Sequence, residues 1–389
     1  MIEPTVRFPE FKGSWNNYKI EDMFDRVGTP VDLDDTQTYR EIGIRSHGKG
    51  IFHKEETTAT EIGNKRVFWI EPDCFVVNIV FAWERAVAKT TEKENGMIAS
   101  HRFPMYKPKK NIVDLDYITE YFITKRGQNV LILASPGGAG RNKTLGQKEF
   151  AKSVVKLPSL PEQQKIAEFL STIDTVIEKK KETVSAWEER KKGVMQKLFS
   201  QEVRFKANDG SEFPDWEKKK IGDVFDVTRG YVLPVKKTRE VSDNEYKYPV
   251  YSSQTKNNGL MGFYNQKLYE NAITWTTDGA NAGKTVYRNE EFYCTNVCGV
   301  LLDKNGNHNA NDCIANMIDT ISKKYVSYVG NPKLMNNVMS EIEIDFPCPE
   351  EQQKIADCLS SLDEVIEKQK ATLAAWEELK KGLLQQMFV

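Results

Sequence analysis

The chain has 389 residues, of which 39% are hydrophobic and 29% are charged, a composition typical of two or three globular domains. The longest apolar run, residues 74–83, is about half of the roughly 20 residues that a membrane helix needs, and 55 Lys and Arg against 56 Asp and Glu exclude DNA binding by bulk positive charge. Residues 1–4 do not resemble a secretory signal and six cysteines are too few for a disulfide framework, so we expect a cytoplasmic protein with reduced thiols.

The first region, residues 1–158, is predicted to be a globular domain of mixed α/β fold. Its apolar residues fall in strand-like runs such as residues 74–81. Residues 101–110 interleave cations with aromatic side chains, a combination that suits phosphate contact and base stacking, although a solvated charged surface is the alternative interpretation. The candidate DNA contacts in this run are Arg102, Tyr106, Lys107, Lys109 and Lys110.

A long helix is predicted over residues 159–204. Apolar residues recur there in alternating steps of four and three, the seam of a coiled coil, once the polar Lys180 and Lys191 fill two gaps. Ser159, Pro161 and Glu162 are typical of a helix start. The seam residues expected to pair with another helix are Ile166, Leu170, Ile173, Ile177, Val184, Trp187, Val194 and Leu198.

The second globular region, residues 205–346, is also predicted to be mixed α/β, with strand-like runs at residues 248–251 and 293–300. Cations and an aromatic ring recur near residues 229–239, and residues 252–258 concentrate side chains able to bond base edges. A polar loop is the alternative interpretation of the second segment. The candidate DNA contacts here are Arg229, Tyr231, Ser252, Ser253, Gln254, Lys256, Asn257 and Lys284.

The last region, residues 347–389, repeats the first helix. Residues 351–388 align without gaps on residues 162–199, and 24 of the 38 positions are identical, so the chain consists of two tandem halves. The seam recurs with the polar Gln369 and Lys380 in the same two gaps, and its apolar members are Ile355, Leu359, Leu362, Ile366, Leu373, Trp376, Leu383 and Met387.

Three arrangements of these helices are open: a self-contained helical core, pairing of the two repeats within one chain, and pairing with another chain. A full-length seam with polar interruptions favours two-stranded pairing, and we expect the two repeats to pair with each other. At a rise of 1.5 Å per residue, 38 residues make a helix about 57 Å long, which could serve as a ruler.

The sequence indicates no catalytic residues, metal ligands or cofactor site. Residues 137–144 and 279–285 come close to a nucleotide-phosphate loop, but neither has its glycine spacing. Asp215 and Glu217 are too close in sequence to converge easily on one metal ion. Cys294, Cys298, Cys313 and His308 do not match a zinc spacing, and we interpret the thiols as buried and structural.

The doubled helix and its surroundings resemble the specificity subunit of type I restriction-modification systems over nearly the whole chain. The resemblance rests on Glu-Gln-Gln-Lys-Ile-Ala at residues 162–167 and 351–356, and on Lys-Lys-Gly at residues 191–193 and 380–382. Arg7-Phe8-Pro9 opens the first half in the family's manner, whereas Val203-Arg204-Phe205 is followed by an insert before Phe213.

This resemblance implies that residues 1–158 and 205–346 are target-recognition domains, each reading one half of a split site in double-stranded DNA, and that residues 159–204 and 347–389 are antiparallel helices that separate them. The helices would dock two methyltransferase subunits, which bind S-adenosylmethionine, and restriction subunits that use ATP would join them. The resemblance also pairs residues 83–86 with residues 278–283. The remaining candidate DNA contacts are Arg45, Lys49, Arg85 and Asn281.

Two other functions remain as alternatives. One is a coiled-coil DNA-binding adaptor or regulator that has no methyltransferase partner. The other is an enzyme in its own right, which the failed motif search disfavours. Neighbouring reading frames for a methyltransferase and a helicase-like protein would favour the restriction-modification interpretation over the adaptor.

Overall fold

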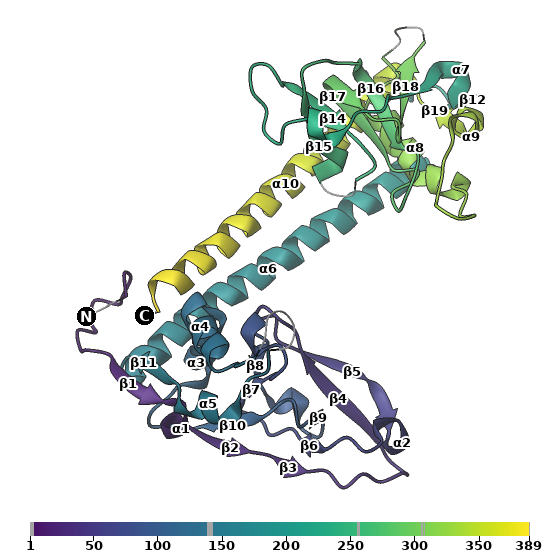
Figure 1. The fold of residues 1–389 in the computed structure, drawn as a ribbon. Coiled ribbons are helices and arrows are strands. Elements are labelled where there is room, and N and C mark those ends of the chain that lie inside the picture. The colour runs from purple at the N-terminus through teal and green to yellow at the C-terminus, as the bar shows by residue number, and fades with distance from the viewer. Residues whose placement is uncertain (1–3, 138–142, 255–256, 305, 307, 389) are drawn as a thin grey trace. The chain divides into compact units, whose positions relative to one another are not determined.

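The computed structural model describes residues 4–137, 143–254, 257–304, 306 and 308–388. Lys256 and residues 138–142 of the first glycine-rich segment lie outside these described residues. The chain forms two compact units: unit 1 comprises Met1–Lys181 with Ala371–Val389, and unit 2 comprises Glu182–Lys370. Each unit therefore contains one globular region together with parts of both long helices (Figure 1).

Unit 1 is built on two sheets. In the core sheet all neighbouring strands are antiparallel, and their order is β2 (Phe24–Val27), β10 (Met105–Pro108), β7 (Phe75–Val77) and β8 (Val87–Lys89). The second sheet has the order β3 (Thr29–Pro30), β6 (Val67–Trp69), β9 (Ile98–Ser100), β4 (Thr38–Ile44) and β5 (Ile51–Thr58). Figure 1 shows β4 and β5 as a long hairpin that reaches away from the core sheet.

Short helices cover the core sheet of unit 1, where Phe75, Tyr117, Phe122 and Phe150 are fully buried. A separate strand pair, β1 (Asn16–Lys19) with β11 (Val154–Leu157), connects this unit to the first long helix. The helices of the globular part are α1 (Ile20–Met23), α2 (Ala59–Ile62), α3 (Leu115–Ile123), α4 (Lys125–Leu133) and α5 (Gln147–Lys152).

Unit 2 has one larger sheet, in the order β13 (Phe225–Arg229), β18 (Cys298–Asp303), β16 (Tyr269–Thr276), β17 (Thr285–Cys294), β14 (Tyr248–Tyr251) and β15 (Leu260–Tyr264). Its first four strands are antiparallel, whereas β14 pairs with β17 in parallel. The strand pair β12 (Glu217–Lys220) with β19 (Glu343–Phe346) lies apart from it, and the helices are α7 (Ile221–Val224), α8 (Asp312–Ser322) and α9 (Asn336–Glu341).

The two units repeat one plan. The order β2-β10-β7-β8 of unit 1 corresponds to β13-β18-β16-β17 of unit 2, and the pair β1–β11 corresponds to β12–β19. The units differ in the strands added to this plan. The connection between β7 and β8, residues 78–86, is therefore equivalent to the connection between β16 and β17, residues 277–284, in agreement with the predicted pairing of residues 83–86 with 278–283.

The two repeats form the long helices α6 (Leu160–Phe199) and α10 (Pro349–Gln386), somewhat shorter than residues 159–204 and 347–389. In unit 1, Leu170 is fully buried in the same core as Met387, and Leu383 packs against it. In unit 2, Leu198 shares a core with Leu359. Of the three arrangements that the sequence left open, the structure has the one in which the two repeats pair antiparallel within one chain.

Two of the four polar seam positions, Lys191 and Lys380, form ion pairs between the helices. Lys191 bonds Asp363 at 2.6 Å in unit 2, and Lys380 bonds Asp174 at 2.8 Å in unit 1. These residues are equivalent in the repeat, since both lysines and both aspartates are 189 positions apart. A polar group at a seam position commonly fixes register and orientation, and each unit carries this same device.

The other seam residues differ in how far they are covered. Ile166, Ile173, Ile177, Ile355 and Ile366 are buried, and Val184 is 9% exposed. Trp187, Val194, Leu362, Leu373 and Trp376 are half-buried. The guanidinium of Arg190 lies 5.2 Å from the centroid of the Trp187 ring, so this seam position lies partly at the surface.

The Glu-Gln motif at the start of each repeat anchors the helix to its globular domain. Glu162, 1% exposed on its side chain, accepts from Arg7 Nε at 2.7 Å, and Gln163 donates to the Pro158 carbonyl at 3.0 Å. In unit 2 Glu351 accepts from Arg204 Nη2 at 2.8 Å. Two buried polar residues in sequence thereby fix the direction in which each helix leaves its domain.

Candidate functional site

Four of the predicted contact residues of unit 2 line one cavity of about 230 Å³. These residues are Ser252, Gln254, Asn281 and Lys284, which come from the turn after β14 and from the connection between β16 and β17. Thr274, Thr276 and Cys298 line the same cavity, at the end of β16 and the start of β18. The cavity therefore lies at one end of the sheet and brings together residues that are far apart in sequence.

Arg288 lines the cavity from within and is only 8% exposed. Its Nε donates to Thr274 Oγ1 at 3.2 Å, its Nη2 donates to the Asn258 carbonyl at 2.7 Å, and its guanidinium lies 3.6 Å from the centroid of the Tyr251 ring. Burial lowers the pKa of Arg288 and raises the pKa of Tyr251, whose hydroxyl donates to Glu290. Arg288 was not among the predicted contacts, because an arginine within a strand gives no local sign of whether it faces solvent or a cavity.

The turn between β14 and β15 holds the polar side chains of residues 252–254, 257 and 258. Ser252 donates its backbone N–H to the Gly259 carbonyl at 2.9 Å, and its hydroxyl accepts from Thr295 Oγ1 at 2.9 Å. Gly259 has a φ of +85°, and a Cβ there would lie 2.9 Å from the Ser252 carbonyl oxygen, so the turn requires glycine. Asn257 is exposed and Ser253 is half-buried on this turn.

Arg229 and Tyr231 belong to the same end of the unit 2 sheet. Arg229 is the last residue of β13 and is exposed, while Tyr231 is 64% exposed. Gly230 between them donates to the carbonyl of Cys298, which lines the cavity, at 3.0 Å. The structure thus adds a cation and an exposed ring to the polar groups at this end.

In unit 1 a cavity of about 450 Å³ occupies the corresponding end of the core sheet. It is lined by residues that follow β7, such as Asn78 and Phe81, and by residues that precede β10, such as His101 and Arg102. Lys54 and Lys65 also line it, although neither was a candidate contact. Cations and aromatic rings surround this cavity, which makes it suitable for an anionic partner with flat bases.

Arg45, Lys49 and Arg85 come together where the β4–β5 turn packs on residues 78–86. His47 donates its N–H to the Glu84 carbonyl at 2.7 Å, and Gly48 donates to the Arg85 carbonyl at 2.9 Å. Arg45 lies 4.8 Å from the Phe52 ring centroid and Lys49 is exposed, whereas Arg85 donates to the Ile123 carbonyl at 3.1 Å.

The predicted cluster of residues 101–110 is not one patch. Arg102 precedes β10, while Lys109 and Lys110 follow it, so they lie beyond opposite ends of that strand. Lys110 is exposed, but Lys109 Nζ donates to the Glu21 carbonyl at 3.2 Å and lies 3.6 Å from Asp25 Oδ1. Lys107 Nζ donates to the Pro72 carbonyl at 2.6 Å.

The prediction for Tyr106 must be corrected. The sequence analysis predicted it as a DNA contact, but it is 6% exposed and its ring packs on Phe150, 5.5 Å between centroids. Burial raises the pKa of its hydroxyl to about 12. Tyr106 sits on a central strand whose side chains alternate between the two faces, and its own points into the core, so it cannot stack on a base in this structure.

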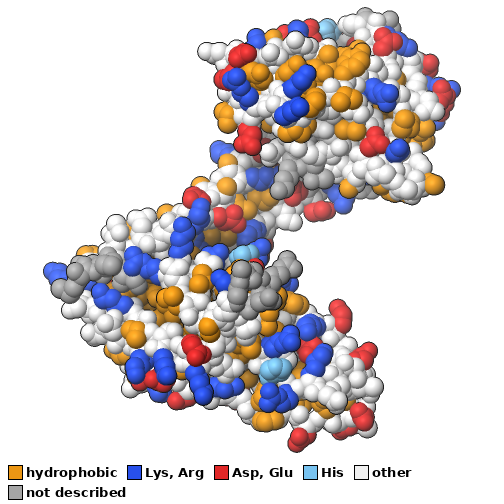
Figure 2. Space-filling view, viewed as in Figure 1, with side chains coloured by type: hydrophobic (Ala, Val, Ile, Leu, Met, Phe, Trp, Pro, Cys, Tyr) orange, Lys and Arg blue, Asp and Glu red, His pale blue; other side chains and the backbone are white. Residues whose placement is uncertain are grey.

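Positive charge is dispersed over the visible face of the molecule rather than gathered in one basic surface: Figure 2 shows Lys and Arg side chains interspersed with acidic and hydrophobic ones. Within the described residues, no group of three or more His, Cys, Asp and Glu side chains could hold a metal ion. No helix in the described part of the chain is long and apolar enough to cross a membrane.

Comparison with known proteins gives a consistent result. The family described as "Type I restriction modification DNA specificity domain" matches residues 13–185 and again residues 214–375. A crystal structure of the S subunit of a type I restriction-modification system from M. genitalium has a TM-score of 0.60 at 16% identity and covers 100% of this chain and 99% of its own. At this sequence identity, the match to the M. genitalium structure shows a similar fold.

Two relatives from Mycoplasma pneumoniae are similar in sequence. The putative type I specificity subunit S.MpnORF285P is 37% identical over 177 residues, 45% of this chain and 56% of the relative, so the match spans about half of that protein. The putative type I specificity subunit S.MpnORF201P is 30% identical over 237 residues, 60% of this chain and 93% of the relative. With two family matches that together cover most of its length, the chain belongs to the family of type I restriction-modification DNA specificity proteins.

Proposed function

We propose that this chain is the DNA sequence-specificity subunit of a type I restriction-modification complex, and that each unit reads one half of a bipartite, asymmetric DNA site. One observation carries the proposal: a cavity lined by polar and cationic residues lies at the same end of the same four-strand plan in both units. Similar plans with different side chains are what two similar but non-identical half-sites require.

The chemistry of the two ends fits the reading of base pairs. Amide side chains such as Gln254 and Asn281 can donate and accept at once, which suits the edge of adenine, whereas Arg102 suits guanine or phosphate. Phosphate contacts by exposed cations would position the chain, and base contacts would specify the sequence. The near-neutral charge of the chain means that this binding depends on local geometry.

The proposed partners follow from the family. Residues 1–158 and 205–346 act as target-recognition domains, while residues 159–204 and 347–389 form the helices that dock two methyltransferase subunits. Those subunits supply S-adenosylmethionine chemistry, and restriction subunits supply ATP-driven cleavage. The family match supports this function over an adaptor that lacks a methyltransferase partner.

Long-read sequencing of DNA from cells that express the chain with its methyltransferase subunits tests the proposal. We expect one split motif with a fixed spacer to be methylated. Asn281→Ala and Arg102→Ala should each relax the motif in one half only, and in different halves. Methylation without any split motif, or the same motif from cells that lack the chain, would disprove the proposed function.

A further inference from the structure

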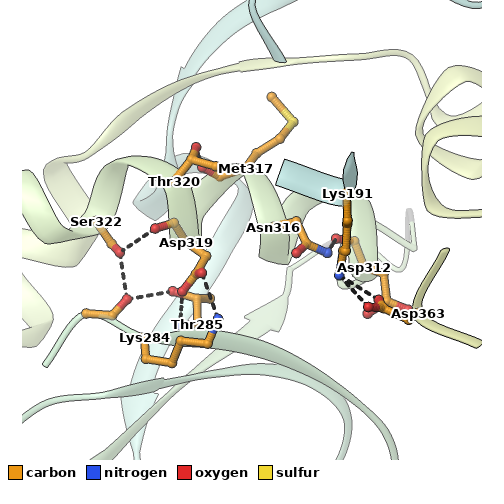
Figure 3. A network of polar contacts seen from close by, with 11 residues as sticks. Lys191, Lys284, Thr285, Asp312, Asn316, Met317, Asp319, Thr320, Ser322 and Asp363 are labelled. Carbon is orange, nitrogen blue, oxygen red and sulfur yellow. Dashed lines mark hydrogen bonds and ion pairs between the residues drawn. The ribbon is translucent and has the colours of Figure 1, made fainter. Parts of the chain in front are cut away.

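An ion pair and hydrogen bonds hold the connection between β16 and β17 against helix α8 (Figure 3). Asp319 accepts the backbone N–H of Thr285 on Oδ1 at 2.8 Å and the Lys284 ammonium on Oδ2 at 2.7 Å. One turn further along α8, Ser322 donates its hydroxyl to the Gly283 carbonyl at 2.6 Å. The last two residues of the connection, Gly283 and Lys284, and the first residue of β17, Thr285, are thus held by two residues of one helix.

The side chains that make these bonds are exposed to water to different degrees. Ser322 is fully buried and the Asp319 side chain is 18% exposed, whereas Lys284 is 47% exposed. Gly283 has a φ of +86°, and a Cβ there would lie 3.1 Å from Val326, so the chain turns tightly against the segment that follows α8. The buried side of the network fixes the backbone, and its exposed side presents Lys284 at the rim of the cavity.

The ion pair changes what Lys284 can do. Lys284 was predicted to contact a DNA phosphate, but its ammonium already has the Asp319 carboxylate at 2.7 Å. To bind a phosphate, Lys284 would have to leave Asp319, and the carboxylate would then repel the DNA. A cation that is neutralised in this way adds little to sequence-independent binding, which depends on the number of phosphates that a protein neutralises.

In unit 1 the equivalent connection is held by backbone and amide bonds and by Arg85, whose guanidinium donates to the Ile123 carbonyl at 3.1 Å. Gln128 donates its side-chain amide to the Trp83 carbonyl at 3.0 Å, and Leu145 donates its N–H to the Ile79 carbonyl at 2.8 Å. These bonds hold the backbone without touching the charge of a rim lysine. The first half-site therefore serves as an internal reference for any change made at Asp319.

We propose that Asp319 is a specificity-determining residue that does not touch DNA: it positions the β16–β17 connection for the second half-site and withholds the Lys284 cation from phosphate. This proposal rests on the proposed function of unit 2 in DNA reading. Holding the backbone favours the correct bases, and cancelling the lysine limits attraction to all other sequences. Both effects raise the ratio of specific to non-specific binding.

A set of variants separates the two roles. Asp319→Asn keeps an oxygen for the Thr285 N–H but removes the negative charge, so it releases Lys284 while leaving the connection in place. Asp319→Ala removes both. Thr320→Ala is the matched control, because Thr320 neighbours Asp319 on α8 and its hydroxyl donates to the Met317 carbonyl of the same helix, at 2.7 Å.

The measurement is the affinity of the complex assembled with its methyltransferase subunits for DNA duplexes, as a function of salt. The duplexes carry the methylated motif, a single-base mismatch in either half, or an unrelated sequence. For Asp319→Asn we expect tighter binding to all duplexes and a salt slope steeper by about one unit. The same change in a chain that also carries Lys284→Ala should leave the slope as it is with Lys284→Ala alone.

For Asp319→Ala we expect the preference for the correct second half-site over a single-base mismatch to fall about tenfold, with discrimination in the first half-site unchanged. If the Asp319→Ala chain fails to assemble with its partners, the proposal is still tested by comparing the salt slopes of Asp319→Asn, Lys284→Ala and the double variant. An unchanged slope for Asp319→Asn, or an equal rise with and without Lys284, overturns the inference. If the unmodified complex discriminates no sequence, it is the proposed function that fails.

Discussion

The buried glutamate at the start of each long helix, with the side chains that bond it, forms a clamp between the helix and its globular domain. The Glu351 clamp at the start of α10 should be stronger than the Glu162 clamp at the start of α6. The Glu351 carboxylate accepts three bonds, from Arg204 Nε at 3.1 Å, Arg204 Nη2 at 2.8 Å and Trp216 Nε1 at 2.8 Å. The Glu162 carboxylate accepts two from Arg7, at 2.7 and 2.8 Å. The Nε1 of Trp15, the counterpart of Trp216 in the sequence, has no hydrogen-bond partner among the described residues.

We therefore predict that Glu351→Gln destabilises unit 2 more than Glu162→Gln destabilises unit 1. A glutamine keeps one acceptor oxygen but turns an NH₂ group towards a donor, and hydrogen bonds to charged groups contribute roughly 1.5–3 kcal/mol each. Both arginines retain some access to water, 16% and 20%, which moderates the loss. We expect about 2 kcal/mol for Glu162→Gln and about 3 kcal/mol for Glu351→Gln, the difference being the bond to Trp216.

Hydrogen exchange followed by mass spectrometry measures each unit separately within the whole chain. Peptides that cover residues 162–170 and 351–359 report the free energy of opening at the start of α6 and α10. A difference of about 1 kcal/mol appears as a roughly fivefold difference in exchange rate. Gln164→Ala and Gln353→Ala, exposed on the same turns, control for changes in helix propensity.

The reasoning is refuted if Glu162→Gln costs as much as Glu351→Gln or more. It is also refuted if both changes cost no more than the exposed controls, because the buried carboxylates would then contribute nothing beyond helix propensity. Trp216→Phe offers an independent check, since it removes the third bond while keeping an aromatic ring at the place where the Trp216 ring lies 5.9 Å from Arg204, and it should bring the Glu351 clamp near the level of the Glu162 clamp.

Three further predictions concern the helices. Burial raises the pKa of Glu120, which contacts Lys380, above its ordinary value near 4.5. The folded state therefore binds more protons than the unfolded state, and the stability of unit 1 should fall as the pH rises above that value. Hydrogen exchange measured at pH 5 and at pH 8 should show this fall in the unchanged chain and not in Glu120→Gln. A fragment that ends at Ser200 has lost the partner of its seam and should dimerise in sedimentation, so a folded monomer at micromolar concentration would contradict the pairing. Four residues inserted after Thr183 lengthen α6 by about 6 Å, and the methylated motif should gain one or two spacer base pairs at about 3.4 Å each; activity on the original spacer alone would show that α6 is not a ruler.

The sequence alone determined the two-half organisation, the long helices and their seam. These features follow from local rules, because an apolar step of three or four residues puts side chains on one helix face whatever surrounds it. The repeat at an offset of 189 also implied that both halves contain equivalent elements. The full-length seam with its polar interruptions favoured two-stranded pairing, and the structure shows that the two repeats pair within one chain.

Only the tertiary structure decided which side chains gather around the cavity at the end of each sheet. Whether Tyr106 faces solvent depends on its central position between β2 and β7, and whether Arg288 lines a cavity depends on a turn about 30 residues away at Asn258. Lys284 looked like a free cation until α8 brought Asp319 to it from 35 residues along the chain. Such neighbours are set by non-local strand pairing and helix packing, which no local pattern of residues encodes.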